Sequence, residues 1–203
     1  MTDDKQIVTT AEGGIDHKII VAFERISQAL RTMAWNSGKQ QQLNPVQSQL
    51  LIFLLRHPNA ASSITALARE FGVSKASLSE TVSALEKKGL INKAATRSDL
   101  RNFSIRLMPE GLQAAAEAAQ YTNLLTAALG NLPAPGKEVL FDALGSLIFE
   151  LHNSGVVPVQ RMCLSCHYHE MRNDGHFCRL LEKQLAVAAL QVDCADHIPA
   201  KVL

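Results

Sequence analysis

Four cysteines lie close together near the end of the sequence, and their spacing suits the binding of a metal. They follow the pattern C-x2-C-x11-C-x15-C, at Cys163, Cys166, Cys178 and Cys194. The two-residue gap of the first pair allows both thiolates to face one ion from a single turn of chain. In a reducing cytosol, metal ligation explains such a cluster better than disulfide bonds do. The pattern therefore predicts a site with four thiolate ligands.

The nature of this metal site has several interpretations. A structural zinc ion is the favoured one, because four thiolates make a closed tetrahedral site. An iron–sulfur cluster held by the same cysteines is the alternative, since the sequence does not separate the two when every ligand is a thiolate. Buried inert cysteines and reversible thiol switches are the interpretations without a metal. His197 is the leading substitute ligand, followed by His176.

The same segment gives little support to catalysis. A catalytic zinc keeps one coordination position open and usually has a carboxylate nearby, whereas four cysteines close the site. Glu170 and Asp174 lie in the segment, but their spacing matches neither HExxH nor H-x-E…P-C-x-x-C. The sequence therefore predicts a protein that is not an enzyme, and a metalloenzyme is only a minor alternative.

A second group of polar residues, between positions 74 and 80, has the character of a DNA-contacting surface. Gly72 supplies a turn after a short helix, and Ser74 is placed to cap the helix that follows. In that second helix Leu78, Val82 and Leu85 recur at steps of four and three, which predicts one buried stripe. The residues at or near its open side are Ser74, Lys75, Ala76, Ser77, Ser79 and Glu80.

A charged hairpin follows the second helix. Two strands are expected, at Ile91–Thr96 and Phe103–Leu107, and the tip between them holds Arg97, Asp99 and Arg101. Helix, turn, helix and hairpin in this order predict a winged helix-turn-helix, whose chemistry is DNA recognition. Of the two arginines, Arg101 is favoured as a DNA contact, because Asp99 can orient its guanidinium group.

Charge and composition narrow the class of protein. Residues 62–107 contain 8 Lys or Arg against 4 Asp or Glu, a net charge of +4, while the rest of the chain carries −3. The basic excess lies where a phosphate backbone would be bound. No apolar run is long enough to cross a bilayer, and the first residues are polar and acidic, which predicts a cytoplasmic protein with no membrane partner.

Long amphipathic helices surround the DNA-binding unit. Apolar residues recur at steps of three and four from Ile15 to about Asn36, and two further apolar helices follow the wing. This is more apolar surface than a small winged-helix core needs, which predicts a helical homodimer interface. The expected fold is mainly α with a small β-wing, in which long N- and C-terminal helices serve dimerisation.

The chain is expected to divide into four parts. The last part should be an ordered appendage with one helix at Leu180–Val192, stabilised by its metal. The parts are a flexible arm (1–14), a winged-helix and dimerisation domain (15–152, with helix-turn-helix and wing at 62–107), a linker (153–160) and a Cys/His-rich metal-binding tail (161–203).

From about Ile15 to His152 the sequence resembles the MarR (multiple antibiotic resistance regulator) family. The resemblance is strongest at SITALAREFGVSKASLSETVSALEKKGLI, at the wing residues SDLR and at LMPEGL just beyond. It implies an obligate homodimer that binds pseudo-palindromic double-stranded operators, usually as a repressor. By the same analogy it implies a small-molecule effector pocket between the dimerisation helices and the helix-turn-helix.

The resemblance also assigns roles to single residues. Lys75, Ser77 and Ser79 match recognition-helix residues that face the major groove. Arg101 matches the wing arginine that enters the minor groove, and Asp99 the acid that steadies it. Two positions depart from the family pattern: Glu80 replaces a common arginine and could accept from a cytosine amino group, and Leu100 replaces another arginine.

Together these observations predict a DNA-binding transcriptional regulator. It would be a homodimeric repressor of a palindromic operator, and its affinity would respond to a ligand, metal or redox signal. The alternative is a metal-dependent protein-interaction module on a dimeric scaffold.

Overall fold

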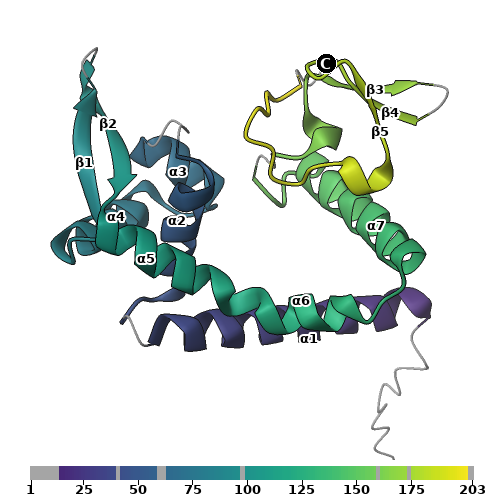
Figure 1. Cartoon of the computed structure of the whole chain (residues 1–203), viewed down its shortest axis with the longest axis horizontal. Helices are drawn as coiled ribbons and strands as arrows, with labels where there is room; N and C mark the ends of the chain where they lie inside the picture. Colours follow the sequence, from purple (N-terminus) through teal and green to yellow (C-terminus); the bar gives the residue numbers. More distant parts are fainter. Residues whose placement is uncertain are drawn as a thin grey trace, which may run out of the picture.

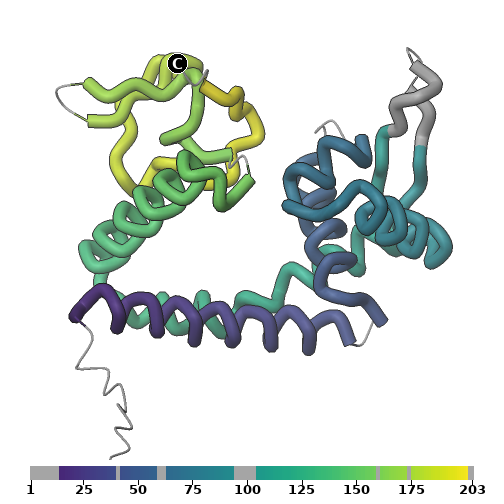
Figure 2. Tube along the Cα trace, turned by 180° about the vertical axis from the view of Figure 1, so that it is seen from behind, coloured from purple at the N-terminus to yellow at the C-terminus, as the bar shows by residue number. Residues whose placement is uncertain are grey.

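The computed structural model describes residues 14–39, 42–58, 63–96, 99–158, 161–172 and 175–200, and within the hairpin it leaves the side chains of 94–96 and 99–103 undescribed. Figure 1 shows two lobes that rise from a long helical base, and Figure 2 shows the same arrangement from behind. One lobe is the winged helix-turn-helix, and the other is the C-terminal segment with the helix beneath it. The architecture is mainly helical with small antiparallel sheets, which confirms the predicted fold class.

The base consists of helices that precede and follow the winged-helix lobe in the sequence and lie side by side (Figure 1). The sequence predicts one helix from Leu112 to about Leu129, but the structure interrupts it with a 3-10 turn. The Ala118 carbonyl beside this turn accepts from Ser37 Oγ at 3.5 Å, so the interruption lies where the two helical runs touch. The base elements are α1 (Ile15–Lys39), α5 (Pro109–Ala118), η1 (Ala119–Thr122) and α6 (Asn123–Gly130).

Three helices and α5 enclose the core of the winged-helix lobe. Its centre is a set of fully buried aliphatic side chains, among them Leu50, Leu51, Leu67 and Leu78. Each burial of such a side chain contributes about 1.5–3 kcal/mol to folding. The helices are α2 (Pro45–Arg56), α3 (Ile64–Glu70) and α4 (Lys75–Lys87).

Each of these helices begins at a polar cap. Asn44 and Gln47 form a capping box, in which the Asn44 side chain accepts from the Gln47 N–H at 2.8 Å and the Gln47 side chain accepts from the Asn44 N–H at 3.2 Å. Ser63 caps α3 by accepting from the Ala66 N–H at 3.1 Å. Such caps satisfy N–H groups that have no partner within the helix, which fixes where each helix starts.

The wing is a two-stranded antiparallel sheet of β1 (Ile91–Thr96) and β2 (Asp99–Leu107). The prediction for β1 is confirmed, while β2 begins four residues earlier than expected. The additional pairing comes from Asp99 opposite Thr96, across a register shift at Ala95 and Thr96. Such a shift is a β-bulge or a related irregularity, which lets two strands stay paired although their side-chain patterns fall out of step.

The second lobe packs on α7 (Ala134–Asn153). The prediction of a helix at Leu180–Val192 is wrong. The chain makes a strand (β5, Lys183–Leu185) and a short 3-10 turn there, because this strand forms hydrogen bonds with β4 (Gly175–Cys178). A ladder made with a neighbouring strand outweighs a modest helix propensity. The elements of this lobe are η2 (Cys163–Ser165), β3 (His169–Arg172), β4 (Gly175–Cys178), β5 (Lys183–Leu185) and η3 (Val187–Ala189), with sheet order β3-β4-β5.

Within the described part of the chain, none of the helices combines the length and the apolar character that a bilayer crossing requires.

Candidate DNA-binding surface and cysteine chamber

Helix α4 is anchored on one side and open on the other. Leu78, Val82 and Leu85 are completely buried against the core, as their spacing predicts. Ser74 begins the helix, and its hydroxyl accepts from the Ser77 N–H at 3.1 Å. Of the predicted DNA-contacting residues, Ser79 is half-buried and the others in this helix region are exposed: Ser74, Lys75, Ala76, Ser77 and Glu80.

The turn before α4 sets the direction of this open face. Gly72 adopts φ +61°, a left-handed conformation that side chains other than that of glycine rarely take. The Val73 N–H then donates to the Ala68 carbonyl at 3.0 Å, which closes the turn. The first turn of α4 therefore projects outward from a rigid support.

The wing is joined to α4 by an ion pair that the sequence did not suggest. Lys93 Nζ of β1 lies 2.8 Å from Glu86 Oε2 at the end of α4, and both side chains are partly exposed. Arg97 lies outside the described residues. Asp99 and Arg101 lie on β2, but their side chains also fall outside the description, so their predicted DNA contacts stay predictions.

The structure brings all four cysteines to one small chamber in the second lobe. The chamber has a volume of about 30 Å³, and its remaining walls come from Tyr168, His169, Leu180, Leu185 and Asp196. All four thiols are free and half-buried: Cys163, Cys166, Cys178 and Cys194. In the described part of the chain, however, no three His, Cys, Asp or Glu side chains are grouped so that they could hold one metal ion.

Backbone hydrogen bonds fix the segments that carry these cysteines. The Cys166 N–H donates to the Cys163 carbonyl at 2.9 Å, and the Cys194 N–H donates to the Arg161 carbonyl at 2.8 Å. The Gln191 N–H donates to Cys163 Sγ at 3.2 Å. Burial raises the pKa of the Cys163 thiol, and the neighbouring thiols raise it further while the Gln191 contact opposes them. The chamber is thus a place where negative thiolate charge needs a positive partner.

The substitute ligands have other contacts. His197 Nε2 lies 3.1 Å from Ser165 Oγ, and His176 Nδ1 lies 2.9 Å from His169 Nε2. Neither His176 nor His197 lines the chamber. The geometry therefore groups the four cysteines without either of them.

The second lobe also contacts the winged-helix lobe, at α2 and α3, and the sequence did not reveal this link. His57 at the end of α2 is buried, and its Nε2 lies 2.8 Å from Asp193 Oδ1, without the alignment of a hydrogen bond. Arg161 Nε lies 3.4 Å from Glu70 Oε1 of α3, and its guanidinium group stacks over the Phe53 ring at 5.4 Å. Asp193 immediately precedes Cys194, so the two sites are adjacent in the chain.

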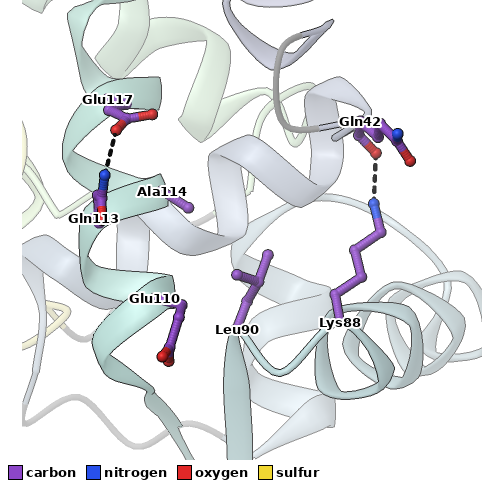
Figure 3. A pocket seen from close by; sticks show the side chains of 7 residues that line it. All are labelled: Gln42, Lys88, Leu90, Glu110, Gln113, Ala114 and Glu117. Atoms are coloured by element: carbon purple, nitrogen blue, oxygen red, sulfur yellow. Dashed lines mark hydrogen bonds between the residues drawn. The ribbon is translucent and has the colours of Figure 1, made fainter.

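An open hollow of about 400 Å³ lies where α5 meets the end of α4 (Figure 3). Five of its seven lining residues carry polar or charged side chains, and it is open to solvent: Lys88 Nζ donates to the Gln42 carbonyl, and Gln113 donates to Glu117 Oε1 at 2.9 Å. Small-molecule sites are mostly apolar and enclose their ligand. This hollow therefore gives no support to the effector pocket implied by the family resemblance.

Comparison with known proteins shows which proteins the winged-helix lobe is similar to. Residues 41–101 match the model of the MarR family. No curated protein sequence matches the chain. Similar folds occur in the Staphylococcus aureus MepR–DNA complex (TM-score 0.58, 20% identity, 64% of this chain and 96% of that chain), in a putative MarR family regulator of Listeria monocytogenes with 26mer DNA (0.58, 19%, 66% and 89%) and in a Peptoclostridium difficile MarR protein (0.59, 17%, 75% and 97%).

The family match covers the elements of the winged helix-turn-helix. Residues 41–101 contain α2, α3, α4, β1 and the start of β2, so the match includes the helix-turn-helix and the first part of the wing. This segment is therefore similar in sequence to the MarR family, and the solved structures share the winged helix-turn-helix fold.

Proposed function

We propose that the chain is a DNA-binding transcriptional regulator that acts as a homodimer on a pseudo-palindromic operator, as a repressor. The observation that carries the proposal is the outward-facing first turn of α4, where Lys75 and Ser77 are exposed on a helix anchored by a buried stripe. A helix presented in this way fits the major groove, with its N-terminal residues at the base edges. Two relatives with the same fold were solved in complex with DNA.

Exposed apolar side chains on the helical base and on α7 support the homodimer. They lie on α1 and on the helices after the wing, and contiguous apolar surface of this kind marks an interface. The members are Ile15, Ile19, Ile20, Phe23 and Ile26 on α1, Leu124 and Leu129 on α6, and Val139, Leu140, Leu147 and Leu151 on α7. Pairing through them would place two α4 helices to read half-sites about 34–36 Å apart.

Operator affinity would respond to a signal that changes the spacing of the two helices. A ligand, metal or redox signal shifts such an equilibrium only if it favours one spacing over the other. The contacts of the second lobe with His57 and Glu70 support a route for that signal, since they connect the cysteine chamber to α2 and α3.

The proposal is tested by measuring binding to a duplex from the DNA upstream of the protein's own gene. Lys75→Ala should weaken binding about 5- to 150-fold, equivalent to the 1–3 kcal/mol of one good base contact. Lys137→Ala is the matched control, because it removes the same charge from the exposed surface of α7. Equal effects of the two variants, or no binding by the wild type, would contradict the proposal.

A further inference from the structure

The width of the cysteine chamber distinguishes between the kinds of metal group it could take. Sulfur ligands lie about 2.3 Å from a zinc ion, so a four-thiolate zinc site leaves no space for a water-sized sphere between its sulfurs. The chamber that the four cysteines line together with five other residues has a volume of about 30 Å³, enough for a water-sized sphere. No three described ligand side chains are grouped for one ion. The four thiols therefore lie farther apart than the ligands of a single ion do.

An iron–sulfur cluster suits the chemistry of the chamber and ligands that are not gathered around one ion. Such clusters are held by four cysteine thiolates, and their irons and sulfides occupy the space between the ligands. Leu180 and Leu185 give the chamber apolar walls, and the Gln191 N–H already donates to Cys163 Sγ at 3.2 Å. Burial and hydrogen bonds to sulfur are the features through which proteins tune these clusters.

The small hydrophobic core of the C-terminal lobe also favours a bound group that stabilises the lobe. The buried apolar residues in the described part of the C-terminal segment are only Met162, Leu185 and Leu190. A segment of about 40 residues with so small a core needs additional stabilisation, such as disulfide bonds or a bound metal, to fold. The cysteines come from η2, the end of β4 and the loop after η3, so one group bound to all four would join every part of the lobe.

We propose that Cys163, Cys166, Cys178 and Cys194 bind an iron–sulfur cluster that holds the C-terminal lobe together. Each thiol releases its proton as it becomes a thiolate ligand, and the cluster replaces the protons as the positive partner. The cluster also fixes the loop at Asp193 and Cys194, which carries the contact to His57 of the winged-helix lobe.

The test is anaerobic purification of the full chain from iron-supplied cells. The wild type should contain iron and acid-labile sulfide in equal molar amounts, with little zinc, and should show a visible absorption and circular dichroism spectrum of a cluster. Cys166→Ser and Cys194→Ser should each lose most of the iron and the sulfide. His197→Gln, which changes the leading substitute ligand, should retain both.

Three results would overturn the proposal. They are one zinc per chain without sulfide, a wild type that holds neither metal nor sulfide, and cysteine variants whose iron and sulfide content equals that of the wild type. The wild-type analysis does not depend on how well any variant folds, so it decides the matter even if Cys166→Ser is recovered in low yield. DNA binding is measured separately and does not enter this test.

Discussion

At the residue scale, one glycine determines how the helical base joins the wing. A Cβ atom at Gly111 would lie 1.8 Å from the Leu90 carbonyl oxygen, which is part of the backbone entering β1. The Leu90 carbonyl also accepts from the Met108 N–H at 2.9 Å, so it has little freedom to move away. Any larger residue at position 111 would have to push α5 away from the wing.

We therefore expect Gly111→Ala to destabilise the protein by about 1–3 kcal/mol or more, the usual cost of overpacking. Gly130→Ala is the control, because a Cβ there meets nothing within 4 Å and alanine favours the helix that contains it. Urea unfolding followed by circular dichroism measures both. A Gly111→Ala variant as stable as Gly130→Ala would contradict the packing described here.

At the element scale, α4 and the wing form one unit, in which we expect two parts to face DNA. The Lys93–Glu86 ion pair and the buried Ile91 connect them, so the orientation of the wing follows that of α4. The recognition helix is expected to read the major groove, while an arginine from the wing suits a narrow minor groove. The contributions of the two parts to operator binding should therefore depend differently on salt concentration.

Arg101→Ala should weaken operator binding and reduce the slope of log K against log salt by about one for each phosphate that the variant no longer neutralises. Arg106→Ala is the control, since Arg106 is exposed on the same strand near its base. Binding measured by fluorescence anisotropy at several salt concentrations gives the slopes. If the Arg101→Ala slope equals that of the wild type, the wing does not touch DNA.

At the scale of the whole molecule, two surfaces connect parts that are distant in the sequence. One is the apolar seam of the helical base, which we expect to bury in the homodimer. The other is the contact between the C-terminal lobe and the back of α2 and α3. Together they would connect the state of the cysteine chamber to the spacing of the two recognition helices.

Phe23→Asp should weaken the homodimer at least thirtyfold, which corresponds to a cost of about 2 kcal/mol at a central interface residue. Sedimentation velocity over a range of concentrations measures the effect. Gln28→Asp is the control, because it places the same acid at an exposed position of α1 that is polar in the wild type. Equal dissociation of the two variants would show that the apolar seam does not form the interface.

Asp193→Asn should loosen the contact between the lobes. Because Asp193 is 43% exposed, the effect is limited to about 1 kcal/mol, or an increase of up to about fivefold in hydrogen exchange at the end of α2 and at the loop of Asp193. Glu170→Gln, which removes a carboxylate paired with Arg172 far from α2, should leave exchange at α2 unchanged. An unchanged α2 in Asp193→Asn would show that this contact does not couple the lobes.

The sequence by itself determined the features that depend on neighbouring residues. The caps at Asn44 and Ser74, the turn at Gly72, the buried stripe of α4 and the strand Ile91–Thr96 all follow from local hydrogen bonds, backbone preference and periodicity. The resemblance to the MarR family was visible for the same reason, because its motifs lie in this locally determined unit.

Only the tertiary structure decided the features that depend on residues far apart in the chain. The pairing of β5 with β4 replaced the helix expected after Leu180, the contact with α1 coincides with the break between α5 and α6, and the docking of Asp193 on His57 joined the lobes. The spacing of the cysteines in the sequence predicted that they lie together but not how far apart their thiols are. Distances across a chamber are fixed by packing, which no local pattern in the sequence records.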